Sequence, residues 1–144
     1  MKRIFTFTLA LLLVFSALPL VGCGSSFDFE RDLDRLLDNG YRISWDRVGN
    51  RALTDLSHEY ANDLKSVGKE MSVWVERQVD LEYEHNVFYF CTMIKFSSNE
   101  QAQAYAACFA FKRSDNREKV AYHKNVVVIT NADDVQRNLD LEFK

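Results

Sequence analysis

The residue types that carry most enzyme chemistry are present in this chain, but their spacing assembles no familiar site. His58, His85 and His123 are far apart, and none stands in an H-x-x-x-H spacing that would place two metal ligands on one helix face. No serine occupies a G-x-S-x-G turn, and no glycine-rich loop is suited to a phosphate. The sequence therefore predicts no catalytic residue, no metal site and no cofactor.

Acidic side chains recur at alternate positions between residues 76 and 84 and invite comparison with a calcium site. Glu76, Asp80 and Glu84 would share one face of a strand there, and alternate side chains on a flat strand diverge instead of wrapping an ion. We therefore expect a solvated polar face without a bound metal.

Cys23 is the one reactive side chain whose surroundings indicate a role. Lys2 and Arg3 are followed by an almost wholly apolar run from Ile4 to Leu20, which ends in small residues. A short basic start, an apolar stretch and small residues at its end form the layout of an export signal. The run is also close to the roughly 20 residues of a membrane span, so an uncleaved anchor is the alternative.

The four residues Leu20-Val21-Gly22-Cys23 resemble the lipobox of bacterial lipoproteins at every position. This resemblance implies that the Cys23 thiol receives a diacylglyceryl group and that residues 1–22 are then removed as a lipoprotein signal peptide. It implies a protein held at the cell membrane, on the extracytoplasmic face, by fatty acyl chains such as palmitate. Two or more chains give stable anchoring, whereas one gives marginal binding. The resemblance ends at residue 23 and says nothing of the family of the remaining chain.

Removal of residues 1–22 takes away two basic residues, so the remaining chain carries 16 basic and 21 acidic residues, a net charge of −5. An acidic domain has no electrostatic reason to bind nucleic acid. Residues 23–26 are the lipidated cysteine and a short linker, whose three steps reach about 10 Å. Residues 27–144 are long enough for one globular domain, which we expect close to the bilayer.

Cys91 and Cys108 form an even pair outside the cytoplasm, which favours a disulfide bond. Cys91 is five residues before the end of its expected strand, which places it about 17 Å from that end. Cys108 is nine residues along the following helix, which runs back along the strand and places it about 14 Å from the helix start. The two cysteines thus reach a similar depth, and the alternative is two small buried apolar side chains.

Four amphipathic or alanine-rich segments predict helices. They are residues 29–37, ending at Asn39-Gly40; residues 53–67, with Asn50 as cap and Gly68 as stop; residues 99–112; and a short helix carrying Val135 and Leu139, capped by Asn131. Alternation and apolar runs predict four strands, at residues 41–45, 71–84, 87–96 and 126–130.

The strands and the two inner helices follow the order βαββαβ, which predicts an α+β fold with a ferredoxin-like core and one added helix at each end. In the usual strand order of that fold, 4-1-3-2, the acidic second strand is an edge and the apolar third strand is central. Another α+β sandwich is the alternative.

The strand at residues 87–96 is apolar on both faces. A two-layer fold covers only one face of its sheet, so the other face needs a further cover. We expect the terminal helices to provide it, through Phe29, Leu33, Leu37, Val135 and Leu139. The other candidates are a second subunit and a partner, for which Tyr89, Met93 and Trp74 are the candidate interaction face. The sequence thus predicts a membrane-anchored module that binds a protein, a ligand or itself. An envelope hydrolase with a site built from scattered residues is the alternative.

Overall fold

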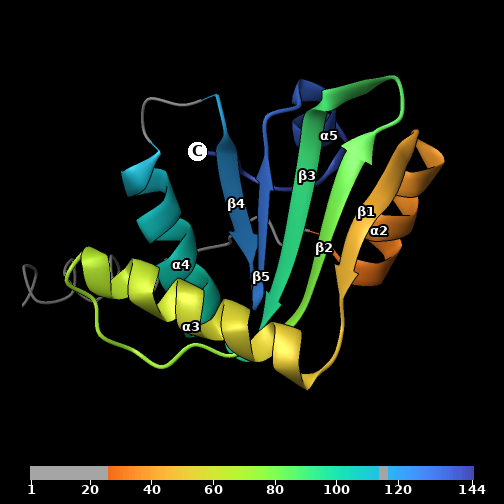
Figure 1. The fold of residues 1–144 in the computed structure, drawn as a ribbon. Helices are drawn as coiled ribbons and strands as arrows, with labels where there is room; N and C mark the ends of the chain where they lie inside the picture. Colours follow the sequence, from red (N-terminus) through yellow and green to blue (C-terminus); the bar gives the residue numbers. More distant parts are fainter. Residues whose placement is uncertain (1–25, 114–116) are drawn as a thin grey trace, which may run out of the picture.

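The computed structural model describes residues 26–113 and 117–144, so Cys23 and the expected signal peptide lie outside the described residues. Over these residues the fold is α+β, with one five-stranded antiparallel sheet and four helices (Figure 1). The helices are α2 (Phe29–Asp38), α3 (Asn50–Ser66), α4 (Asn99–Lys112) and α5 (Asp133–Asn138). The strands are β1 (Tyr41–Arg47), β2 (Val75–Tyr83), β3 (Asn86–Phe96), β4 (Lys119–His123) and β5 (Val126–Thr130).

The strand order is β1-β2-β3-β5-β4, which differs from the ferredoxin-like order that the sequence predicts. β2 is not an edge, because β1 pairs with it on one side and β3 on the other. The prediction lacks β4, which pairs with β5 as a hairpin and forms the far edge of the sheet. The expected central place of β3 is confirmed, and its neighbouring residues Met93 and Ile94 are both fully buried on opposite faces.

Helices cover both faces of the sheet (Figure 1). α2 and α5 lie on one face, where Phe29, Leu33, Val135 and Leu139 pack with Met93 in one core cluster. This confirms the expectation that the terminal helices cover the apolar face. Each side chain of this size stabilises the fold by roughly 1.5–3 kcal/mol when fully buried. α3 and α4 pack on the opposite face over a second cluster built around Ile94 and Phe96.

α5 begins differently from the sequence-based expectation. Ala132 is its N-cap residue, and the side chain of Asn131 bonds to β3 instead. Asn131 Nδ2 donates to the carbonyl of Phe88 at 2.7 Å, and its Oδ1 accepts from the amide of Phe90 at 3.0 Å. The amide side chain therefore takes the place of a strand neighbour where β5 has already ended.

The first described residues are fastened to the domain on the α2/α5 side. The amide of Ser26 donates to Asp140 Oδ2 at 2.7 Å. Phe27 is buried in the cluster under α2 and α5, and its ring lies 6.2 Å from that of His123. Cys23 precedes Ser26 by three residues, which span about 10 Å at most when extended. None of the described helices has the length and apolar character needed to cross a membrane.

Candidate functional site

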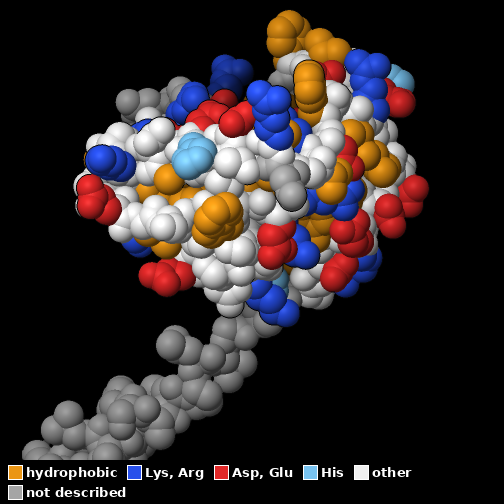
Figure 2. Space-filling model, turned by 60° about the horizontal axis from the view of Figure 1, so that its bottom comes forward, with side chains coloured by type: hydrophobic (Ala, Val, Ile, Leu, Met, Phe, Trp, Pro, Cys, Tyr) orange, Lys and Arg blue, Asp and Glu red, His pale blue; other side chains and the backbone are white. Residues whose placement is uncertain are grey.

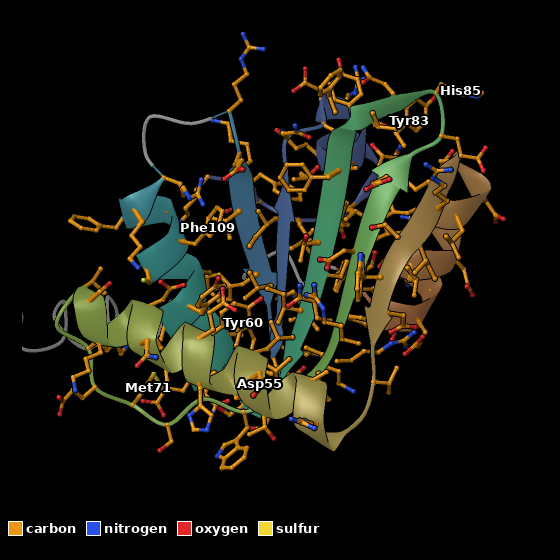
Figure 3. All side chains as sticks on the ribbon, in the orientation of Figure 1. Asp55, Tyr60, Met71, Tyr83, His85 and Phe109 are labelled. Carbon is orange, nitrogen blue, oxygen red and sulfur yellow. The ribbon has the colours of Figure 1, made fainter. Side chains whose placement is uncertain are left out.

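A cleft opens between α3, α4 and the sheet, with a volume of about 360 Å³. Its floor comes from β2, β3 and β5, through Gln78, Thr92, Ile94 and Ile129 among others. Its walls are the facing sides of α3 and α4, and Figure 3 shows Tyr60 and Phe109 projecting into the space between these helices and the sheet. The size and the mixture of aromatic and polar side chains are those of a small-molecule site.

A continuous polar network runs across the floor of the cleft. The Tyr60 hydroxyl donates to Gln78 Oε1, and Gln78 Nε2 donates to Asp80 Oδ1 at 2.9 Å. Thr92 Oγ1 also donates to Asp80 at 2.9 Å, and Arg47 of β1 lies 3.2 Å from the same carboxylate. Gln78 is 5% exposed, so its amide would be costly to bury without these partners. The network fixes the floor in one arrangement.

Beyond the cleft, the same face of β1 and β2 carries no covering helix (Figure 1). We call it the open face and define it by Arg42, Trp45, Arg47, Asp80, Glu82 and Thr92. Its charges are paired, since Arg42 lies 3.6 Å from Glu82 and Arg47 lies beside Asp80. Trp45 is 63% exposed, and the guanidinium of Arg47 lies 5.3 Å from its ring centre. The acidic row of β2 thus makes cross-strand ion pairs, and Glu76 does the same with Lys95.

Burial raises the pKa of three side chains that line the cleft, Tyr60, Tyr105 and Cys108. Tyr60 and Tyr105 stack with ring centres 4.4 Å apart. Loss of solvation raises the pKa of both phenols above the usual value, which keeps them neutral and able to donate. Burial also raises the pKa of the Cys108 thiol, whose Sγ lies 3.5 Å from the carbonyl of Asp63. A neutral buried thiol is a poor nucleophile.

Of the two interpretations of Cys91 and Cys108, the structure supports two small buried apolar side chains and not the possible disulfide, because both cysteines are free and lie on opposite faces of the sheet. Cys91 shares the face of Met93, under α2 and α5, whereas Cys108 belongs to the cluster under α4. Similar depth along the strand and helix axes does not bring the two Cβ atoms together when the sheet lies between them.

We expect two titratable thiols in a Cys23→Ser chain that is unfolded in guanidinium without a reductant. Both thiols should react far more slowly in the folded chain, because burial raises the pKa of Cys91 and Cys108 and excludes the reagent. A chromogenic disulfide reagent measures both rates. A count of no thiols in the unfolded chain would restore the disulfide.

The residues expected to form an interaction face are not brought together. Met93 is fully buried beneath the terminal helices and is unable to contact a partner. Tyr89 at the start of β3 is 44% exposed, beside Phe88 at 80%. Trp74 is 59% exposed but precedes β2 and lines a different cavity. In Figure 2, hydrophobic side chains are scattered among charges of both signs over the lower surface of the domain.

That second cavity, of about 500 Å³, lies between α3 and the segment before β2. Ser57 and His58 both line it, which raises the question of a hydrolytic pair. The Ser57 hydroxyl is already committed, because it donates to the Leu53 carbonyl at 2.6 Å and accepts from the Val75 amide at 2.9 Å. It therefore ties α3 to β2 and is not placed as a nucleophile.

Within residues 26–113 and 117–144, no three His, Cys, Asp or Glu side chains are grouped closely enough to hold a metal ion. Comparison of the chain with protein-family models finds no match, and neither does comparison with the curated proteins or with the solved structures. Sequence reasoning missed the cleft, because its lining comes from six separate segments with no shared pattern.

Proposed function

We propose that this chain is a lipid-anchored extracytoplasmic domain that binds a ligand in the cleft between α3 and α4. The observation that carries the binding role is the cleft itself, with aromatic walls above a floor of fully bonded polar groups. The lipid anchor is supported by the lipobox-like residues 20–23. The fold carries no hydrolytic pair at Ser57, so binding is favoured over the hydrolase alternative.

A lipid at Cys23 would be compatible with this role. Ser26 and Phe27 join the domain on the α2/α5 side, whereas the cleft opens on the α3/α4 side of the sheet. A lipid attached three residues before Ser26 would hold the α2/α5 side nearer the bilayer. The cleft would then remain open to molecules of the envelope.

A protein contact is the second candidate role. The specific observation in its favour is the exposed start of β3, where Val87, Phe88 and Tyr89 are 58%, 80% and 44% exposed. The backbone there is not open to strand addition, because Asn131 already bonds to Phe88 and Phe90. A partner would therefore contact side chains and not extend the sheet.

The binding role is tested with a panel of neutral, anionic and cationic aromatic fragments. We expect amide chemical-shift changes in the full chain, held in detergent micelles, to cluster at Thr92, Tyr105 and Phe109. Phe109→Ala should weaken these changes at least fivefold because it removes a wall of the cleft. Phe111→Ala is the matched control, since Phe111 lies on the same helix but is 75% exposed and outside the cleft.

Shifts confined to α2, α5 or the start of β3 across the whole panel would contradict a ligand site in the cleft. Equal effects of Phe109→Ala and Phe111→Ala would do the same, because they would show that the cleft wall contributes nothing particular.

A further inference from the structure

Among the described residues, the charged groups that line the cleft leave one carboxylate without an ion-pair partner. Lys112 Nζ lies 2.6 Å from Asp63, and Arg113 lies 3.5 Å from Glu118. Glu59, on the α3 wall, makes no ion pair with any residue of the described chain. The lining therefore has a net negative charge, which agrees in sign with the net charge of −5 after removal of residues 1–22.

Tyr105 supplies a second and independent feature. Its side chain is 5% exposed and lines the cleft, yet its hydroxyl makes no hydrogen bond to the residues that the structure describes. The oxygen is not among the fully enclosed unpaired atoms, so it reaches the cleft surface. This hydroxyl at the surface of the cleft is free of any partner in the described chain, so a ligand with a hydrogen-bonding head can bond it in place of water.

The aromatic wall already holds a cation of the protein's own. The guanidinium of Arg113 lies 5.8 Å from the ring centre of Phe109 and is paired with Glu118. The negative face of an aromatic ring attracts a cation, and the attraction grows when water is excluded. The wall formed by Phe109 and Glu118 is thus suited to a guanidinium or ammonium group.

We propose that the ligand of the cleft is an organic cation, a guanidinium or protonated amine carried on an apolar body. This inference rests on the ligand-binding role proposed above. The cationic head meets Glu59 and the Tyr105 hydroxyl, and the apolar body packs on the aromatic wall. An anion finds no free positive group, because Lys112 and Arg113 are both paired. The same cationic head occurs in small polyamines and in the arginine side chains of polypeptides.

The test uses the full chain in detergent micelles and measures binding by calorimetry and amide chemical shifts. Agmatine represents the free small cation, and acetyl-Gly-Arg-Gly-amide represents the polypeptide source. Acetyl-Gly-citrulline-Gly-amide is the neutral isostere of the peptide. We expect at least one cation to bind with shifts at Tyr105 and Phe109, and the citrulline peptide to bind at least tenfold more weakly. Tighter binding of agmatine or of the arginine peptide identifies the source.

Three variants locate the cation. Glu59→Gln and Tyr105→Phe should each weaken binding about two- to fivefold, because each removes one partner of the cationic head. Arg113→Ala should strengthen binding by a similar factor, because it frees Phe109 and Glu118. Arg117→Ala is the matched control, since Arg117 is exposed and does not line the cleft.

Equal binding of the arginine and citrulline peptides would overturn the cation proposal while leaving a ligand-binding cleft intact. Neutral fragments that bind at Phe109 while both cations fail would do the same. Weaker binding in Arg113→Ala would also overturn it, because Arg113 would then be a contact and not a competitor. Failure of every fragment to shift the cleft residues would instead refute the binding role itself.

Discussion

Deletion of residues 131–144 is expected to abolish cooperative folding of the domain at 25 °C. The deletion removes Val135 and Leu139, which are 0% and 3% exposed in the core cluster under α2. It also uncovers Met93 and removes the two backbone hydrogen bonds between Lys144 and Val120, at 2.9 and 3.1 Å. Each large side chain contributes roughly 1.5–3 kcal/mol, against a net stability of about 5–15 kcal/mol for a whole domain. Circular dichroism during heating measures the loss.

A point variant shows whether the deletion acts by removing the apolar contacts of α5 or only by shortening the chain. Val135→Asp places a carboxylate in the same core, where an unpaired charge costs several kcal/mol. We expect its melting temperature to fall by about 10 °C or more. Asn138→Asp adds the same charge to an exposed position of the same helix and should shift the midpoint by about 2 °C at most.

An unchanged midpoint in Val135→Asp would show that α5 is not a structural cover. A truncated chain that is still folded but dimeric by light scattering would mean that a second copy can replace the helix. In that case the buried surface around Met93 would be the dimer contact that the sequence left open.

The local elements could be predicted because their patterns are short-range. The stripe of Phe29, Leu33 and Leu36 fits one helical face, and Asp28 caps that helix by accepting from the Arg31 amide at 3.0 Å. The apolar surplus of β3 also predicted correctly that both faces of the strand would be covered. Such patterns report what a segment buries, and the burial of apolar surface is the main force that drives folding.

Strand order could not be predicted in the same way, because it depends on pairings between distant segments. β4 is five residues long and buries only Val120 and Ala121, so it has neither alternation nor a long apolar run. Without β4, the remaining elements follow the order βαββαβ, which is that of the ferredoxin-like sheet. A missed edge strand therefore changed the whole topology, although each of the other strands and helices overlaps the range that the sequence predicts.

The sequence itself contained a reason to reject the possible disulfide between Cys91 and Cys108. Alternation along β3 places Cys91 on the face of Met93, and the terminal helices were expected to cover that face. A helix on the other face, carrying Cys108, then has no access to Cys91. Two cysteines at the same depth along their strand and helix axes can still be far apart sideways. A disulfide bond requires their Cβ atoms to be close in all three dimensions.

The cleft lay beyond sequence reasoning for a further reason. In the sequence, Gln78 and Thr92 are ordinary polar residues on separate strands. Only the structure shows that both side chains donate a hydrogen bond to Asp80. Tyr105 belongs to a helix whose apolar residues predict only burial. The functional interest of its hydroxyl comes from a missing partner, which only the three-dimensional arrangement can reveal.

Replacement of Cys23 by serine is expected to remove the chain from its membrane anchor almost completely. A serine hydroxyl does not accept the diacylglyceryl group that the lipobox-like residues 20–23 imply. In a bacterial host, the wild-type chain should begin at Cys23 by mass spectrometry and should incorporate an alkyne-labelled palmitate. The variant should carry no label and should either accumulate as an uncleaved precursor or leave the membrane fraction.

The Cys23→Ser chain carries no acyl group, so its loss of membrane affinity should exceed even the difference between two acyl chains and one. One chain binds a bilayer with a constant of about 10⁴ M⁻¹, whereas two or more give stable anchoring. Ser25→Ala is the matched control, because residue 25 lies outside the four-residue motif and should leave labelling unchanged. A Cys23→Ser chain that is cleaved normally and keeps both its palmitate label and its membrane retention would place the anchor elsewhere. The orientation of the cleft relative to the bilayer would then lose its basis, while the cleft would still be open to its ligand.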